Sequence, residues 1–292
     1  MVANKFLLSR RQALISIAGF TGGIVLTNCA NDKNSQTLSL GARFADGYQA
    51  PTVFTNSPGQ RAPYTLIGEE GFPITENVPN SIDLSVTEIS TGETIFDGEI
   101  SRHGEPGVIP YFPLIFSPSR PGEYKVEGKN LNGHHKILVV EQSEINLVQL
   151  GQKMRSIKTP TFEDNLDVKP ICTKSSGVCP LHKISLDESL EKSLPTALLV
   201  STPRFCQTDV CGPALEILIK QSEILDEELS IIHVEVFKEP EKQNFSTTPI
   251  IGVLGLNFEP SLIVANAEGV ITSILNFAMD SKEVSEALAT VV

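Results

Sequence analysis

The sequence predicts two folded parts of different class, an all-β part over residues 38–142 and an α/β part over residues 171–292. Short stretches of alternating apolar and polar residues, separated by Gly, Pro and Asn, fill the first part and are typical of antiparallel sheets. In the second part, apolar runs alternate with stretches of helical periodicity. At 292 residues the chain is long enough for two cores, and we expect each part to fold alone. Residues 143–170 form a connector that leads into the second part.

Residues 1–29 have the features of an export signal. Basic residues, among them Arg10 and Arg11, precede an apolar run that is too short for a comfortable membrane span. The stretch Ser9–Leu14 resembles a twin-arginine export motif. We therefore expect the protein outside the cytoplasm, in the periplasm or at the cell surface.

The end of this segment, Leu26–Cys29, resembles a lipobox, whose cysteine is lipidated after cleavage. We expect a lipid on Cys29 to anchor the protein to a membrane, and residues 30–37 to serve as a polar tether. The alternative is that Cys29 is discarded with the signal peptide.

Charge and cysteine number narrow the class of protein. The formal net charge of −12, with no basic block beyond the N-terminus, argues against a nucleic-acid partner. Of the five cysteines, Cys29 stands alone and the others form two close pairs, an even number that fits an oxidising compartment. The histidines do not cluster with the thiols along the chain, so we expect no four-ligand zinc site, no other metal and no cofactor.

The alternating pattern in the all-β part predicts about seven short strands over roughly 100 residues. This number of strands suggests an immunoglobulin-like sandwich. It contains no cysteine and no evident catalytic residue, so we interpret it as a spacer or protein-binding module. The clearest alternating stretches are Ser81–Ile89, Tyr111–Phe116, Gly122–Gly128 and Lys136–Glu141.

The first cysteine pair of the second part, Cys172 and Cys179, encloses a short segment with Gly177 for flexibility. A small closed loop is sterically easy there, so we expect a structural disulfide that stabilises the fold by about 2–3 kcal/mol. The alternative is a second redox pair that relays electrons to Cys206 and Cys211.

The second pair lies between a strand and a helix. The apolar run Ala197–Val200 predicts a buried strand, and helical periodicity begins after Cys211. A helix N-terminus stabilises a thiolate and lowers the pKa of the thiol. Residues i and i+5 of a helix are about 8–9 Å apart, too far for a disulfide. If the two cysteines pair, Cys206 must therefore lie in the loop, with Gly212 as the helix cap and Pro213 at the first helical position.

Further helices and strands are predicted before and after the segment that carries Cys206 and Cys211. A capping box beginning at Ser185 predicts a short helix, and an apolar β-branched run predicts a strand that contains His233, interpreted as a core or sheet-end histidine. A helical turn, a β-hairpin and a C-terminal helix capped by Ser281 follow. The expected ranges are 185–193, 229–237, 249–256, 262–275 and 282–291.

These residues resemble the thioredoxin-like superfamily over about residues 145–292. Phe205-Cys206 falls where thioredoxins place Trp-Cys, and Cys211-Gly212-Pro213 is similar to the start of their Cys-Gly-Pro-Cys. The spacing here is CxxxxC, and Ala214 follows Pro213 where the family has its second cysteine. The resemblance implies a thioredoxin-like fold with Cys206 and Cys211 as its catalytic pair.

Pro260, directly before the expected hairpin, matches the position of the cis-proline of that family. The resemblance implies that Pro260, its neighbour Glu259 and Phe205 form the substrate-binding surface beside the active thiol. Glu259 stands where thioredoxins usually have Thr.

The leading hypothesis is an exported thiol–disulfide oxidoreductase that acts on protein disulfides or with a membrane redox partner. Cys206 would attack a partner disulfide and Cys211 would resolve the mixed disulfide, although the reverse assignment remains open. We expect the Cys206–Cys211 bond to be reduced more readily than a Cys172–Cys179 bond, which has no helix start beside it.

Two alternatives remain. Thr202-Pro203 followed by CxxxxC is similar to the atypical two-cysteine peroxiredoxins of the bacterioferritin-comigratory type, which would make the protein a thiol peroxidase. The second alternative is a protein without enzymatic activity. It would be either a protein whose disulfides are only structural or a copper carrier of the Sco type with His233 as a ligand.

Overall fold

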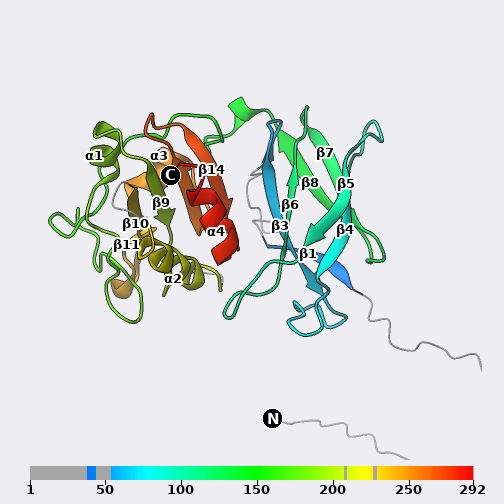
Figure 1. The fold of residues 1–292 in the computed structure, drawn as a ribbon, viewed down its shortest axis with the longest axis horizontal. Coiled ribbons are helices and arrows are strands. Elements are labelled where there is room, and N and C mark those ends of the chain that lie inside the picture. Colours follow the sequence, from blue (N-terminus) through cyan, green and yellow to red (C-terminus); the bar gives the residue numbers. More distant parts are fainter. Residues whose placement is uncertain (1–37, 44–53, 207–208, 226–228, 292) are drawn as a thin grey trace, which may run out of the picture. The chain divides into compact units, whose positions relative to one another are not determined.

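The first part of the chain folds into two β-sheets, in agreement with the alternating pattern (Figure 1). Their strand orders are β1-β3-β6 and β2-β8-β7-β4-β5, with neighbours antiparallel except for the parallel pair β2–β8. The computed structural model describes residues 38–43, 54–206, 209–225 and 229–291, so the expected signal segment, Cys29 and the tether lie outside the described residues. The strands are β1 Ser39–Ala42, β2 Phe54–Thr55, β3 Gln60–Ile67, β4 Ser81–Glu88, β5 Thr94–Ser101, β6 Phe112–Phe116, β7 Gly122–Gly128 and β8 His135–Val140.

Alternation places the apolar side chains between the two sheets. In β4 every second residue is buried, and the core includes the fully buried rings of Tyr64, Phe112 and Tyr124. The hydroxyl of Tyr124 donates a hydrogen bond of 2.8 Å to the carbonyl oxygen of Arg120, just before β7 begins. This bond closes the corner at which the chain enters β7.

The second part is a four-stranded sheet with the order β10-β9-β13-β14 (Figure 1). β10 runs parallel to β9, whereas β13 runs antiparallel to both β9 and β14. A two-stranded ribbon of β11 and β12 and four helices complete it, so the described chain is a mixed α/β structure dominated by sheets. The bounds are α1 Leu186–Glu191, β9 Thr196–Val200, α2 Cys211–Ser222, β10 Ser230–Val234, β11 Phe237–Glu239, β12 Asn244–Thr247, α3 Pro249–Leu254, β13 Ser261–Ala265, β14 Ile271–Asn276 and α4 Ser281–Leu288, with short 3₁₀ turns at Gln142–Glu144 and Pro240–Lys242.

Helices cover both faces of this sheet. As a consequence, every residue of β9 and β13 is buried. Leu199 and Leu262 lie in one core cluster with residues of α2 and α4. Their neighbours Leu198 and Ile263 point to the other face, in a cluster with residues of α1 and α3. A continuous apolar run is therefore what these strands require, as expected for a sheet enclosed on both sides.

Tertiary contacts change three local predictions. The hydroxyl of Ser185 accepts a hydrogen bond from the backbone N–H of Thr159, so the expected capping box does not form. The expected strand 229–237 is interrupted after β10, because the backbone N–H of Val236 bonds to the hydroxyl of Thr202 instead of to a neighbouring strand. Asp280, not Ser281, caps α4 by accepting from the N–H of Glu283.

The connector packs against the second part, since Leu147, Val148 and Met154 lie in its core. Lys169–Pro170, at the end of the connector, is a cis peptide bond that the sequence did not indicate.

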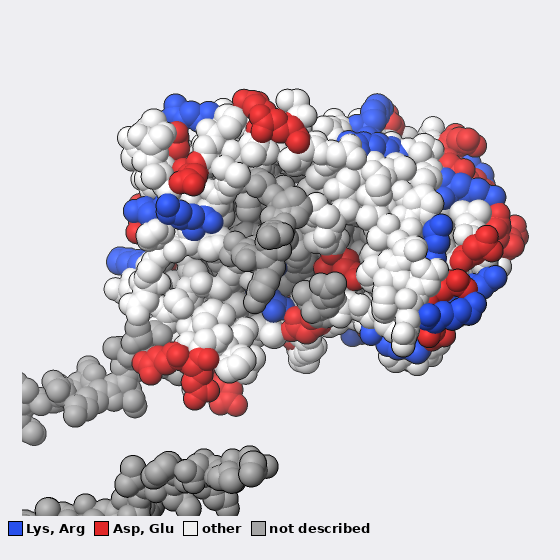
Figure 2. Space-filling view, turned by 180° about the vertical axis from the view of Figure 1, so that it is seen from behind, with Lys and Arg blue, Asp and Glu red and all other residues white. Residues whose placement is uncertain are grey.

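Among the described residues, no helix combines the length and the apolar character that crossing a membrane requires. On the face shown in Figure 2, Lys and Arg lie beside Asp and Glu and form no single basic patch.

The two parts share buried residues. Tyr111 of the first part lies in a core cluster of the second, and Phe277 of the second lies in the core of the first. Arg61 in β3 forms an ion pair of 2.6 Å with Glu283 in α4, and both side chains are less than one-tenth exposed, at 6% and 8%. Independent folding of each part stays a prediction, and a separated part would expose these groups to water.

Candidate functional site

A disulfide joins Cys206 and Cys211, with a Cα–Cα distance of 6.1 Å. Cys211 is the first residue of α2 and Cys206 lies in the preceding loop, which confirms the inference from their spacing. The helix begins earlier than predicted. Val210 is its N-cap, so Gly212 and Pro213 occupy the second and third helical positions, where a missing N–H costs no intrahelical hydrogen bond.

The two cysteines differ in exposure. Cys211 is fully buried, whereas Cys206 is partly exposed. The ring of Phe205 stands edge-on to the ring of Phe245, which is 50% exposed, at a centroid distance of 6.2 Å. The exposed side of the disulfide is therefore at Cys206, which follows Phe205 in the chain.

Glu259 and Pro260 lie at this site. The Glu259–Pro260 peptide bond is cis, as the position of Pro260 led us to expect. One carboxylate oxygen of Glu259 accepts a hydrogen bond from the backbone N–H of Thr202. A carboxylate oxygen and the two disulfide sulfurs all lie within 4.8 Å of one another. Burial raises the pKa of Glu259 to about 7, so the carboxyl group changes charge near neutral pH.

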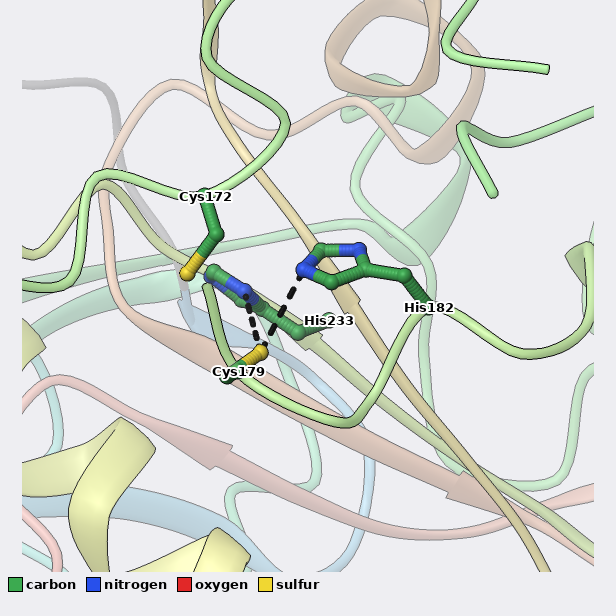
Figure 3. Close-up of side chains that lie close together, drawn as sticks. All are labelled: Cys172, Cys179, His182 and His233. Atoms are coloured by element: carbon green, nitrogen blue, oxygen red, sulfur yellow. Dashed lines mark hydrogen bonds between the residues drawn. The ribbon is translucent and has the colours of Figure 1, made fainter. Parts of the chain in front are cut away.

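The other cysteine pair differs from the expectation. Cys172 and Cys179 form no disulfide; both are free and buried. The side chains of His182 and His233 join them, and one potential ligand atom from each of the four residues lies within 4.8 Å of the others (Figure 3). The sequence-based statement that the histidines do not cluster with the thiols is therefore wrong. We refer to these four residues as the Cys2His2 cluster.

Hydrogen bonds order this cluster. The sulfur of Cys179 is 3.3 Å from Nε2 of His182 and 3.5 Å from Nδ1 of His233 (Figure 3). Nε2 of His233 lies 3.1 Å from the backbone carbonyl oxygen of Ser201, an acceptor only, so this nitrogen carries the proton. Nδ1 of His233 is then left with a lone pair directed at the thiols.

The four groups influence one another's protonation. A hydrogen bond from Cys179 lowers the pKa of Cys172, and the same contact raises the pKa of Cys179, so the pair holds a single negative charge readily. Burial lowers the pKa of His182. Burial is also the largest influence on His233 and lowers its pKa. The hydrogen bonds with Cys172 and Ser201 and the nearby charges of Glu235 and Cys172 together outweigh it, so the pKa is raised.

A buried carboxylate holds the loop that carries Cys172. Glu235, just after β10, accepts hydrogen bonds from the backbone N–H and the hydroxyl of Thr173. The hydroxyl of Thr173 also accepts a bond of 3.3 Å from the backbone N–H of Arg204, in the loop of the disulfide. Burial raises the pKa of Glu235 to about 7. The Cys2His2 cluster and the disulfide loop are thus joined through Thr173.

One part of this cluster had a sequence signal. Cys179 and His182 are separated by two residues, which is a common spacing for metal ligands, but the distant Cys172 and His233 gave no such pattern. The sequence placed Cys206, Cys211, Glu259, Pro260 and Phe205 together, and the structure brings the two cysteines and Glu259 within reach of one another.

No family model, no curated protein and no solved structure matches this chain.

Proposed function

We propose that this protein is a thiol–disulfide oxidoreductase with a thioredoxin-like second part, and that Cys206 and Cys211 are its reactive pair. The observation that carries the proposal is a disulfide between one partly exposed and one buried cysteine, beside a cis-proline and an ionisable carboxyl group. The sheet order β10-β9-β13-β14 with an antiparallel β13 supports the thioredoxin-like assignment.

For the first part we propose an immunoglobulin-like sandwich. Its two packed sheets and the hydrogen bond from Tyr124 to the backbone of Arg120 support this assignment, because a tyrosine that closes such a corner is a recurring feature of these sandwiches. The proposed role is that of a spacer or protein-binding module.

The reaction is thiol–disulfide exchange. In the reduced protein the Cys206 thiolate attacks one sulfur of a partner disulfide, the partner bond breaks and its second sulfur leaves as a thiolate. Cys211 then attacks the sulfur of Cys206, which restores the Cys206–Cys211 bond and releases the partner as a dithiol. Two electrons pass to the partner, and a second, dithiol partner returns the protein to its reduced form by the reverse steps.

The burial of the two sulfurs assigns their roles in this proposal. Only Cys206 is open to a partner, so it forms the mixed disulfide, and Cys211 at the start of α2 resolves it. The N-terminus of α2, a helix of 12 residues, favours the thiolate of Cys211 during resolution.

Trapping with single variants tests this assignment. Cys211→Ser should accumulate mixed disulfides with partner proteins, because the resolving thiol is missing, whereas Cys206→Ser should accumulate none. Non-reducing electrophoresis and mass spectrometry of the trapped species provide the measurement. If neither variant traps a partner and the reduced wild type consumes hydrogen peroxide, the protein is a thiol peroxidase and the proposal is wrong.

We also propose that the protein is exported and anchored through a lipid on Cys29, on the basis of the sequence patterns alone. Replacement of Cys29 by Ser should release the protein from the membrane fraction, because one anchoring group is lost. Cell fractionation with detection of the second part is the measurement. Full retention of Cys29→Ser in the membrane after cleavage would rule out the lipid anchor.

A further inference from the structure

We propose that Cys172, Cys179, His182 and His233 bind one Zn²⁺ ion, which holds the loop before α1 against β10 of the sheet. This site is separate from the proposed oxidoreductase chemistry and does not depend on it. The four side chains converge from two places in the chain: three from the loop that precedes α1 and the fourth from β10 (Figure 3).

The donor geometry fits a tetrahedral zinc ion. Zinc binds sulfur at about 2.3 Å and imidazole nitrogen at about 2.0–2.1 Å, which places the donors of a tetrahedral site roughly 3.3–3.8 Å apart. The sulfur of Cys179 lies 3.3 Å and 3.5 Å from the two imidazole nitrogens, and all four donors lie within 4.8 Å of one another. Small side-chain rotations are enough to close the remaining separation.

The chemistry of the donors favours zinc. Two thiols and two imidazoles are the Cys2His2 set of structural zinc sites, while calcium and magnesium require oxygen donors. All four residues are buried, and Cys172 and Cys179 lie in an apolar core with residues such as Leu181, Leu199 and Leu215. No coordination position opens to solvent, so the site is structural and not catalytic.

Surrounding groups orient His233 and the backbone beside Cys172, whereas Nδ1 of His182 is buried without a hydrogen-bond partner among the described residues. Nε2 of His233 donates to the carbonyl oxygen of Ser201 and presents the lone pair of Nδ1 to the cluster. Glu235 fixes the backbone next to Cys172 through Thr173. A disulfide would need none of these contacts, whereas a metal-bound histidine is normally held by such a second hydrogen bond.

The ion would also offset the free-energy cost of burying charged thiolates. Thiols and imidazoles in an apolar core lose their hydration, and a thiolate there needs an opposite charge. Zn²⁺ supplies that charge when the thiols release their protons, so the site binds more weakly as pH falls. A zinc ion also keeps both thiols from oxidising to a disulfide in an exported protein.

Metal analysis of the full-length protein tests the proposal. Purified without chelators, it should contain one zinc per chain by elemental mass spectrometry, with Cys206–Cys211 disulfide-bonded and both Cys172 and Cys179 as thiols. Those thiols should resist alkylation until a chelator is added under denaturing conditions. Cobalt added to metal-free reduced protein should give the visible absorption of tetrahedral Co²⁺ and a thiolate-to-cobalt charge-transfer band.

Variants locate the ion. Cys179→Ser and His233→Ala should lose at least tenfold in zinc affinity, whereas His134→Ala, at an exposed histidine of the first part, should retain one zinc. The double variant Cys206→Ser/Cys211→Ser should also retain one zinc, which separates this test from failure of the proposed redox function. If a ligand variant does not fold, the cobalt spectrum of the wild type decides.

Three results would overturn the proposal. One is a wild-type protein free of metal with a Cys172–Cys179 disulfide, which would restore the expected clip or redox relay. The second is a cobalt spectrum without thiolate charge transfer. The third is stoichiometric copper and no zinc in the protein as purified without chelators, which would favour a copper carrier.

Discussion

Arg61→Ala is expected to lower the free energy of unfolding by about 3–5 kcal/mol, because it leaves a buried carboxylate without its counter-charge. Arg61 binds both carboxylate oxygens of Glu283, at 2.8 Å and 2.6 Å. It also donates to the backbone carbonyl oxygens of Asn276 and Ala278, at the end of β14 and just beyond it. The variant therefore loses the ion pair and leaves two carbonyl groups without this donor.

Urea unfolding followed by circular dichroism measures this loss, and Arg43→Ala is the matched control. Arg43 pairs with Asp209 at 2.7 Å and also links the two parts, but Asp209 is 48% exposed, so the expected loss is below about 1 kcal/mol. The double variant Arg61→Met/Glu283→Met should regain part of the stability, because no buried charge is left unpaired. Equal midpoints for Arg61→Ala and Arg43→Ala would contradict the argument.

Glu259→Gln is expected to slow thiol–disulfide exchange by about 10–100-fold at pH 7–8. The carboxyl group of Glu259 has a pKa of about 7, raised by burial, and its oxygen lies within 4.8 Å of both sulfurs. That separation allows the carboxylate to accept the thiol proton of Cys211 through one water molecule. Gln cannot accept it, so the pH dependence of the rate near pH 7 should disappear as well.

Glu241→Gln is the control for the rate, because Glu241 is exposed and pairs with Arg204 on the surface. Its exchange rate should equal that of the wild type, measured by stopped-flow reduction of a fluorescent disulfide substrate. An unchanged rate and pH profile in Glu259→Gln would remove the carboxyl group from the proposed mechanism while leaving the roles of the cysteines intact.

The same carboxyl group makes stability depend on pH. Its pKa is 4.5 in the unfolded chain and about 7 in the folded protein, so between these values the folded state retains a proton that the unfolded state has lost. Stability is therefore lost as pH rises through this window. At pH 8 the free energy of unfolding of Glu259→Gln should exceed that of the wild type by about 1–2 kcal/mol, a value already reduced because Glu259 is partly exposed. At pH 4 the two free energies should be equal.

The sequence by itself determined the local features of the loop that carries the Cys206–Cys211 disulfide. The apolar run before Cys206 and the helical periodicity after Cys211 depend on neighbouring residues only, so they predicted the strand, the loop and the helix that the structure contains. The rule that residues five apart on a helix cannot form a disulfide placed Cys206 in the loop. The cis bond at Pro260 was expected from the resemblance to the thioredoxin-like superfamily and not from neighbouring residues.

Only the tertiary structure decided the state of Cys172 and Cys179. Loop length alone permitted a disulfide, but His233 reaches Cys179 from 54 positions further along the chain because β10 pairs with β9 in a register that directs its ring toward the loop. Likewise, Arg61 donates a hydrogen bond to Glu283, which lies 222 positions further along the chain. Alternation and periodicity state which face of an element is buried, but not which distant side chains share that face, because packing between elements decides that.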